Sequence, residues 1–126
     1  MTMQNSMASM KNEGGKIHLS GPLSEWLFSS KFWFDFNARH GTMFDQFEED
    51  DADVPIVNAI VEALDVKVSF LQNLGVSDIE FVYRWTPEQG FLKISVPRES
   101  LLSELVRFRD FLVDAAAKNH CVTLSL

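Results

Sequence analysis

The stretch DIEFVYRWTPEQGFLKISV, residues 78–96, decides the fold of this chain. Its first half places apolar side chains at every second position, and these are Ile79, Phe81, Tyr83 and Trp85. Its second half repeats the pattern with Leu92, Ile94 and Val96. A period of two predicts strands, and TPEQG between the two runs is typical of a turn. The stretch therefore predicts a β-hairpin with each of these apolar sets on its inner face.

Long amphipathic helices are predicted on both sides of this hairpin. Upstream, apolar residues recur at spacings of three and four from about 55 to 74, where Pro55 suits a helix start and Gly75 a helix end. Downstream, the same spacing predicts a helix from about 98 to 118. The residues expected to be buried are Val57, Ile60, Val61, Leu64, Val68, Leu71 and Leu74 in the first helix, and Leu101, Leu105, Phe108, Leu112 and Ala116 in the second.

Shorter elements are predicted near both ends of the chain. KIHLS, residues 16–20, alternates as a strand, and Gly21-Pro22 then suits the start of a short helix that buries Leu23, Trp26 and Leu27. CVTLSL, residues 121–126, carries almost no charge, which favours a strand in the centre of a sheet. The last strand–helix–strand unit fits a right-handed crossover between parallel strands.

The segment KFWFDFN, residues 31–37, fits two periods. Phe32, Phe34 and Phe36 alternate with polar residues and Trp33, which favours a strand with an aromatic inner face. A helix that continues from Pro22 is the alternative. Residues 38–54 have no period, so we expect a long loop there.

The predicted order is β-α-β-loop-α-β-β-α-β. This order indicates an α+β fold, a single domain with one mixed β-sheet of about five strands packed against two long helices. A chain of 126 residues can bury a core of its own. Residues 1–15 are polar and end in glycine, so we expect a disordered N-terminal tail and a folded domain over 16–126.

Composition narrows the partners and the compartment. The formal net charge is −7 and the basic side chains form no cluster, which disfavours binding to nucleic acid or to an anionic membrane. No apolar run approaches the roughly 20 residues that span a bilayer, and no secretory signal is recognisable. Cys121 is the only cysteine, so an intramolecular disulfide is excluded. We therefore expect a cytoplasmic protein.

No motif for catalysis, metal binding or cofactor binding is present. His18, His40 and His120 do not share a helical spacing, and neither a phosphate-binding loop nor an EF-hand can be written. We therefore expect no enzyme, no metal and no cofactor. Asp35 with His40 and Asp45 could form a carboxylate–imidazole constellation near a cleft, and a small hydrolase or nuclease could use His18, His40 or His120.

Aromatic and acidic residues meet in one region of the sequence. Eight of the fifteen aromatic side chains fall between Trp26 and Phe47, more than one strand face and one short helix can bury. Exposed rings beside carboxylates suit a basic protein partner, because rings supply buried area and charges select the partner. The predicted partner-binding residues are Trp33, Phe44, Asp45, Phe47, Glu48, Glu49, Asp50, Asp51 and Asp53. In the alternative interpretation, the rings hold the loop in place by packing, and the acidic run is a solvated loop without a binding role.

The sequence therefore predicts a small acidic, non-enzymatic protein-binding module. In size, charge and lack of a catalytic signature it resembles bacterial toxin-neutralising proteins. That resemblance implies an immunity-type inhibitor that occludes the active site of a basic toxin domain, such as a nuclease that binds phosphates. The alternatives are a secretion or effector chaperone and a small His-dependent hydrolase or nuclease. A monomer and a homodimer with the aromatic patch as its interface both stay open.

Overall fold

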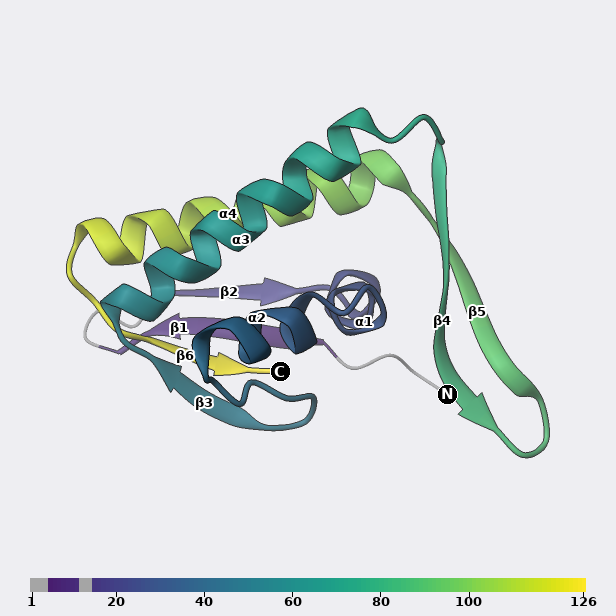
Figure 1. Cartoon of the computed structure of the whole chain (residues 1–126), viewed down its shortest axis with the longest axis horizontal. Helices are drawn as coiled ribbons and strands as arrows, with labels where there is room; N and C mark the ends of the chain where they lie inside the picture. The colour runs from purple at the N-terminus through teal and green to yellow at the C-terminus, as the bar shows by residue number, and fades with distance from the viewer. Residues whose placement is uncertain (1–4, 12–14) are drawn as a thin grey trace.

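The computed structural model describes residues 5–11 and 15–126, and Figure 1 shows their arrangement. The protein is α+β, as the sequence predicts. Within the described residues the strands form two separate antiparallel sheets. In chain order the elements are β1 (Ser6–Met10), β2 (Lys16–Leu19), α1 (Gly21–Ser29), α2 (Phe32–His40), β3 (Glu49–Ala52), α3 (Val54–Asn73), β4 (Asp78–Thr86), β5 (Gly90–Pro97), α4 (Arg98–Ala117) and β6 (Val122–Ser125).

The larger sheet has the strand order β2-β1-β6-β3. Ala8 on β1 lies opposite Leu124 on β6, and both are buried on the face that the helices cover. The next residues along these strands, Ser9 and Thr123, lie on the other face and are partly exposed. This alternation is typical of an antiparallel sheet with one face packed and one face open. The prediction of a central C-terminal strand is confirmed, since β6 lies between β1 and β3.

Both predicted long helices are confirmed, and Figure 1 shows α3 and α4 running side by side over the larger sheet. An ion pair between Asp65 and Arg109, at 2.7 Å, joins their surfaces. Their completely buried side chains are Val57, Ile60, Leu64 and Leu71 on α3, and Leu105, Phe108, Leu112 and Ala115 on α4. Among the residues expected to be buried, the half-buried ones are Val61, Val68, Leu74 and Ala116.

The predicted hairpin is confirmed as β4 and β5, but it does not join the larger sheet. It forms a two-stranded sheet of its own that projects from one end of the helix pair (Figure 1). The prediction of one mixed sheet of about five strands is therefore wrong in this respect. The predicted parallel crossover is also wrong, because β5 and β6 belong to different sheets and β1 occupies the place beside β6.

A β-bulge changes which side chains of β4 face inward. The register shifts between Val82 and Arg84, and the extra residue reverses the alternation beyond it. Arg84 therefore lies on the inner face of the hairpin. Trp85, which the sequence places beside Ile79 on that face, lies on the outer face and is 59% exposed.

The prediction of a disordered tail over residues 1–15 is wrong for residues 6–10. These residues form β1, with Ser6, Ala8 and Met10 buried. The Ser6 hydroxyl forms a hydrogen bond with the Ser24 hydroxyl and donates to the Leu126 carbonyl oxygen at 3.5 Å. This strand shows little hydrophobic pattern because its side chains are small or polar. Pairing with β2 on one side and β6 on the other stabilises it. The rest of the predicted tail includes residues 1–4 and 12–14, which lie outside the described residues.

The prediction of a strand over residues 31–37 is also wrong, because helix α2 forms there. Phe32, Trp33 and Phe36 fall on one face of this helix and are buried. Seven residues are too few to separate a period of two from a period of 3.6. Gly41, with φ of +68°, ends the helix in the left-handed conformation that glycine adopts at little cost. The predicted loop is correspondingly shorter and contains β3.

Candidate partner-binding site

The loop of residues 41–48, between α2 and β3, holds the centre of the predicted site. Asn37 on α2 fixes its shape. The Asn37 side-chain nitrogen donates to the Phe44 carbonyl oxygen at 2.8 Å, and its oxygen accepts from the Thr42 hydroxyl at 2.7 Å and the Phe44 N–H at 3.0 Å. The loop is therefore held in one shape although it lacks regular secondary structure.

Two rings predicted as partner contacts lie beneath this loop instead of on it. Trp33 is only 1% exposed and Phe44 is also buried, with their ring centroids 5.4 Å apart. The helical phase of α2 turns Trp33 into the core, and Asn37 holds Phe44 against it. The expectation that these two rings offer their faces to a partner is therefore wrong.

A pocket of about 430 Å³ opens above the two buried rings. Its rim is apolar at Phe34 and Met43, which are both exposed, and acidic at Asp45 and Glu48. The full lining is Phe28, Trp33, Phe34, Asn37, Met43, Phe44, Asp45 and Glu48. Phe34 and Met43 are not among the predicted partner-binding residues. The helical phase of α2, with Gly41 as its stop signal, could have placed Phe34 on the exposed side.

Phe47 is an exposed ring, as the sequence predicts, and its backbone is unusual. The side chain is 61% exposed and φ is +66°. A left-handed conformation costs a residue other than glycine about 1–3 kcal/mol, and such residues concentrate at functional sites. The Arg84 guanidinium lies over the ring, 5.4 Å from its centroid. The surrounding structure therefore holds this ring in an exposed position.

Helix α1 carries the acid that fixes Arg84, and its own start is firmly capped. The Ser20 hydroxyl accepts from the Leu23 N–H at 3.3 Å. Glu104 on α4 accepts from the Ser20 N–H at 2.7 Å and from the Ser20 hydroxyl at 2.6 Å. The first turn of α1 is thereby anchored to α4.

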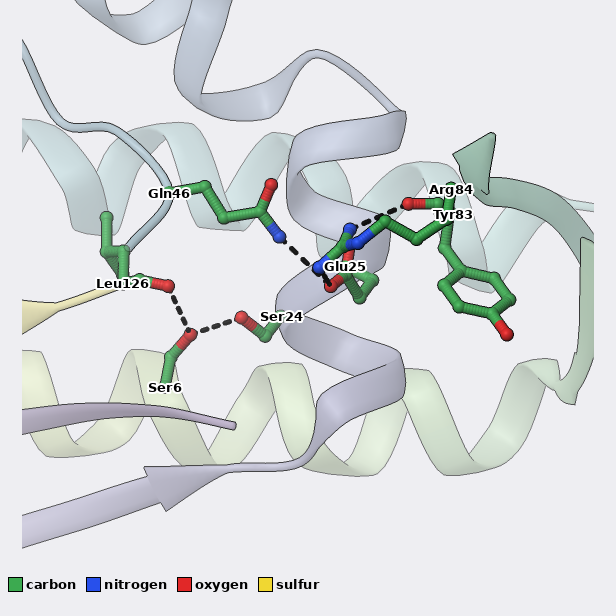
Figure 2. A network of polar contacts seen from close by, with 7 residues as sticks. All are labelled: Ser6, Ser24, Glu25, Gln46, Tyr83, Arg84 and Leu126. Atoms are coloured by element: carbon green, nitrogen blue, oxygen red, sulfur yellow. Dashed lines mark hydrogen bonds and ion pairs between the residues drawn. The ribbon is translucent and has the colours of Figure 1, made fainter. Parts of the chain in front are cut away.

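A buried ion pair ties the loop to the hairpin, as Figure 2 shows. Glu25 on α1 is 2% exposed, and its two carboxylate oxygens lie 2.6 and 2.7 Å from the two terminal nitrogens of Arg84. The Gln46 side-chain nitrogen donates to the same carboxylate at 3.0 Å. Bidentate pairs of an arginine and a carboxylate are strong and directional. This pair was not predicted, because no local sequence pattern connects residues 59 positions apart.

The carboxylates of β3 continue the acidic surface along the edge of the larger sheet. Asp51 accepts from the Lys11 ammonium at 2.6 Å and from the Thr123 hydroxyl at 2.9 Å. The hydrogen bond from Lys11, followed by that from Thr123, lowers the pKa of Asp51. Glu49 accepts from the Ser125 hydroxyl at 3.1 Å. All three carboxylates of this strand, including Asp50, are exposed.

Asp53, the last of the predicted partner-binding residues, has a structural task. It is the N-cap of α3, where its carboxylate accepts from the Ile56 N–H at 3.1 Å. Such a cap satisfies one of the free N–H groups of the first helical turn. The acidic surface that remains consists of Asp45, Glu48 and the three carboxylates of β3.

The structure separates the residues of the catalytic alternative. Asp35 and His40 line a pocket of about 230 Å³ beside α3, whereas Asp45 lines the pocket at the 41–48 loop. His18 lies on β2, and His120 follows α4. Within residues 5–11 and 15–126, no group of three or more His, Cys, Asp or Glu side chains could hold a metal ion.

The chain matches no protein-family model, no curated protein and no solved structure. In the part of the chain that the structure describes, none of the helices combines the length and the apolar character needed to cross a membrane. Any function must therefore be argued from the surface itself.

Proposed function

We propose that this chain is a small acidic, non-enzymatic and cytoplasmic protein-binding module. Its binding surface consists of the 41–48 loop, the exposed Phe34 and the acidic strand β3. The observation that carries the proposal is the pocket with buried rings below it and Asp45 and Glu48 on its rim. Binding surfaces concentrate their energy in aromatic and apolar anchors, while surrounding charges select the partner.

The chemistry of the pocket suits a basic side chain. A lysine or arginine entering it meets the exposed ring of Phe34 and two carboxylates at the mouth. Contact between a cation and a ring contributes about 0.5–2 kcal/mol, depending on how far water is excluded. The carboxylates add attraction over a longer range. A basic surface is therefore the preferred partner of this site.

The concrete form of the proposal is an immunity-type inhibitor of a basic toxin domain. A toxin that cleaves nucleic acid binds phosphates with lysines and arginines. The carboxylates of the loop and of β3 can occupy the positions of those phosphates. The exposed rings of Phe34 and Phe47 then cover the substrate-binding groove of the toxin and exclude its substrate.

Preorganisation supports a role in binding. Asn37 fixes the loop from within, and the Glu25–Arg84 pair fixes it against the hairpin. A surface that is already ordered loses little conformational entropy when it binds. The negative field can then speed the encounter with a basic partner without waiting for a rearrangement.

The test is charge reversal on a matched pair of variants. Asp45→Lys with Glu48→Lys changes the rim of the pocket, whereas Asp110→Lys with Asp114→Lys changes the net charge equally on α4. The partner is the basic protein that co-purifies with this chain in equal stoichiometry. Its association rate should fall at least tenfold for the rim variant, because the carboxylates no longer steer the encounter electrostatically. The α4 variant should keep most of its rate. Equal rates for the two variants would show that only net charge matters and would remove the site.

A second measurement separates rings from charges. Phe47→Ala should raise the dissociation rate by about thirtyfold, the effect of losing roughly 2 kcal/mol at a hot spot. Its association rate should change little, because no charge is lost. Unchanged dissociation of both Phe47→Ala and Phe34→Ala would remove the exposed rings from the proposed contact.

A further inference from the structure

The described strands leave four sheet edges, and three of them are protected against pairing. Strand β2 is only four residues long and carries Lys16 and His18. Strand β3 has three consecutive carboxylates, and the Asp50 side chain accepts from the Asp51 N–H at 2.9 Å. Strand β4 contains the bulge. Short strands, charges and bulges are the usual means by which proteins block an edge.

The fourth edge, that of β5, is protected less than the other three. The strand has eight residues, and its only charged side chain is Lys93. Its pairing with β4 identifies the backbone groups that stay free. The Arg98 N–H donates to the Ser77 carbonyl oxygen at 2.9 Å, which sets the alternation along the strand. Leu92 and Ile94 then bond to β4, while the backbone groups of Phe91, Lys93 and Ser95 point away from it.

The outer face of the same hairpin is apolar near its tip. Trp85 lies directly opposite Phe91, and both rings are exposed, with Val82 beside them on this face. The bulge turns Trp85 outward, and bulges that redirect a side chain are common beside functional sites. A two-stranded hairpin is marginally stable by itself, whereas three or more strands support one another. Figure 1 shows the hairpin running past α1 and standing apart from the larger sheet.

We propose that β5 pairs antiparallel with β5 of a second copy of this chain, so that two hairpins form one four-stranded sheet. The free backbone groups allow a two-fold axis at Leu92, Lys93 or Ile94. An axis at Lys93 sets two ammonium groups opposite each other, which is unfavourable. An axis at Ile94 sets Pro97, which has no N–H, opposite Phe91 and brings the second copy toward α4.

The axis at Leu92 satisfies the side chains best. It places Phe91 of each copy opposite Lys93 of the other, where ammonium and ring attract each other. The outer row then reads Trp85, Phe91, Lys93 and Val82 across the four strands, with no like charges opposed. On the inner face Leu92 meets Leu92. This self-complementarity favours a second copy over an unrelated partner, and it does not depend on the 41–48 loop.

Sedimentation of two matched lysine variants tests the pairing. We expect the wild-type chain to dimerise with rising concentration. Phe91→Lys should be monomeric, because it opposes the lysine at position 93 of the second copy. Ser95 is exposed like Phe91, and its backbone groups also point away from β4, but it lies beyond the overlap of residues 90–94, so Ser95→Lys should still dimerise. A wild-type chain that stays monomeric at all concentrations would overturn the proposal, as would equal dimerisation of the two variants.

Crosslinking tests the register. Two facing residues that do not exchange hydrogen bonds have Cβ atoms close enough for a disulfide. In a Cys121→Ser background, Leu92→Cys should therefore form a covalent dimer on oxidation, and Ile94→Cys should not. A crosslink at 94 instead of 92 would overturn the proposed axis, and a crosslink at neither would overturn the pairing.

Discussion

The larger sheet and the β4–β5 hairpin differ in how they are supported. The larger sheet has one face under the helices, where Ala8 and Leu124 are fully buried, and its open face is polar and hydrogen-bonded. The hairpin buries only the base of its inner face, at Ile79, Phe81 and Val96. Toward its tip it exposes two large rings.

This difference separates stability from recognition. Burial of apolar side chains supplies most of the folding free energy, so the helix-covered sheet must carry it. Exposed rings contribute little to folding and are available to other molecules. The 41–48 loop combines both roles, because its buried ring, Phe44, belongs to the core while Phe47 and the rim of the pocket face solvent.

Two tryptophan-to-alanine variants test this separation most directly. Trp33→Ala removes a buried ring and should lower the free energy of unfolding by about 3–5 kcal/mol. Trp85→Ala removes an exposed ring and should change it by less than about 0.5 kcal/mol. Denaturant unfolding at low protein concentration measures both. Similar losses for the two variants would contradict the division of roles.

The Glu25–Arg84 pair is where the two regions join, so breaking it should have the next largest effect. Glu25→Ala leaves the Arg84 charge without its partner and should cost about 2–3 kcal/mol, somewhat below a fully buried pair because Arg84 keeps some contact with water. Exchange of the backbone amide hydrogen of Gln46 should also accelerate, because the Gln46 side chain loses its hydrogen bond to Glu25 and the loop is held less firmly.

A double variant supplies the control for this pair. Glu25→Leu with Arg84→Met replaces both charges by apolar groups, so no charge is left unpaired. It should be clearly more stable than either single variant in a double-mutant cycle. Additive losses would mean that the two side chains do not act on each other.

Periodic apolar patterns could be predicted from the sequence. Both long helices, α1 and the hairpin have a strong period and turn or stop residues at their ends, and they form where expected. The strand β1 has almost no apolar contrast, since its inward side chains include Ser6 and Ala8. Its place is determined by pairing on both sides, which local sequence does not contain.

The candidate site was predictable in its composition but not in its geometry. The sequence brings rings and carboxylates together, and Phe47 and the acids of β3 are exposed as expected. Which rings face outward depends on the helical phase of α2, and residues 31–37 reveal this phase only when Gly41 is recognised as the end of a helix. The outward turn of Trp85 depends on one extra residue in β4, which leaves no mark in hydrophobicity.

The smallest expected effect concerns the open face of the larger sheet, where Lys11 and Asp51 form an exposed pair. Their hydrogen bond lowers the pKa of Asp51 below the ordinary value of 3.8 and raises that of Lys11 above 10.5. The difference in the free energy of unfolding between the wild-type chain and Asp51→Asn should therefore be largest at neutral pH. It should fade as the pH falls through the pKa of folded Asp51, and again as the pH rises through that of folded Lys11. Unfolding of the wild-type chain and Asp51→Asn across pH gives this profile, and Lys11→Met should reproduce it. A difference that does not change with pH would assign the effect to a weaker hydrogen bond from Thr123 instead of the ion pair.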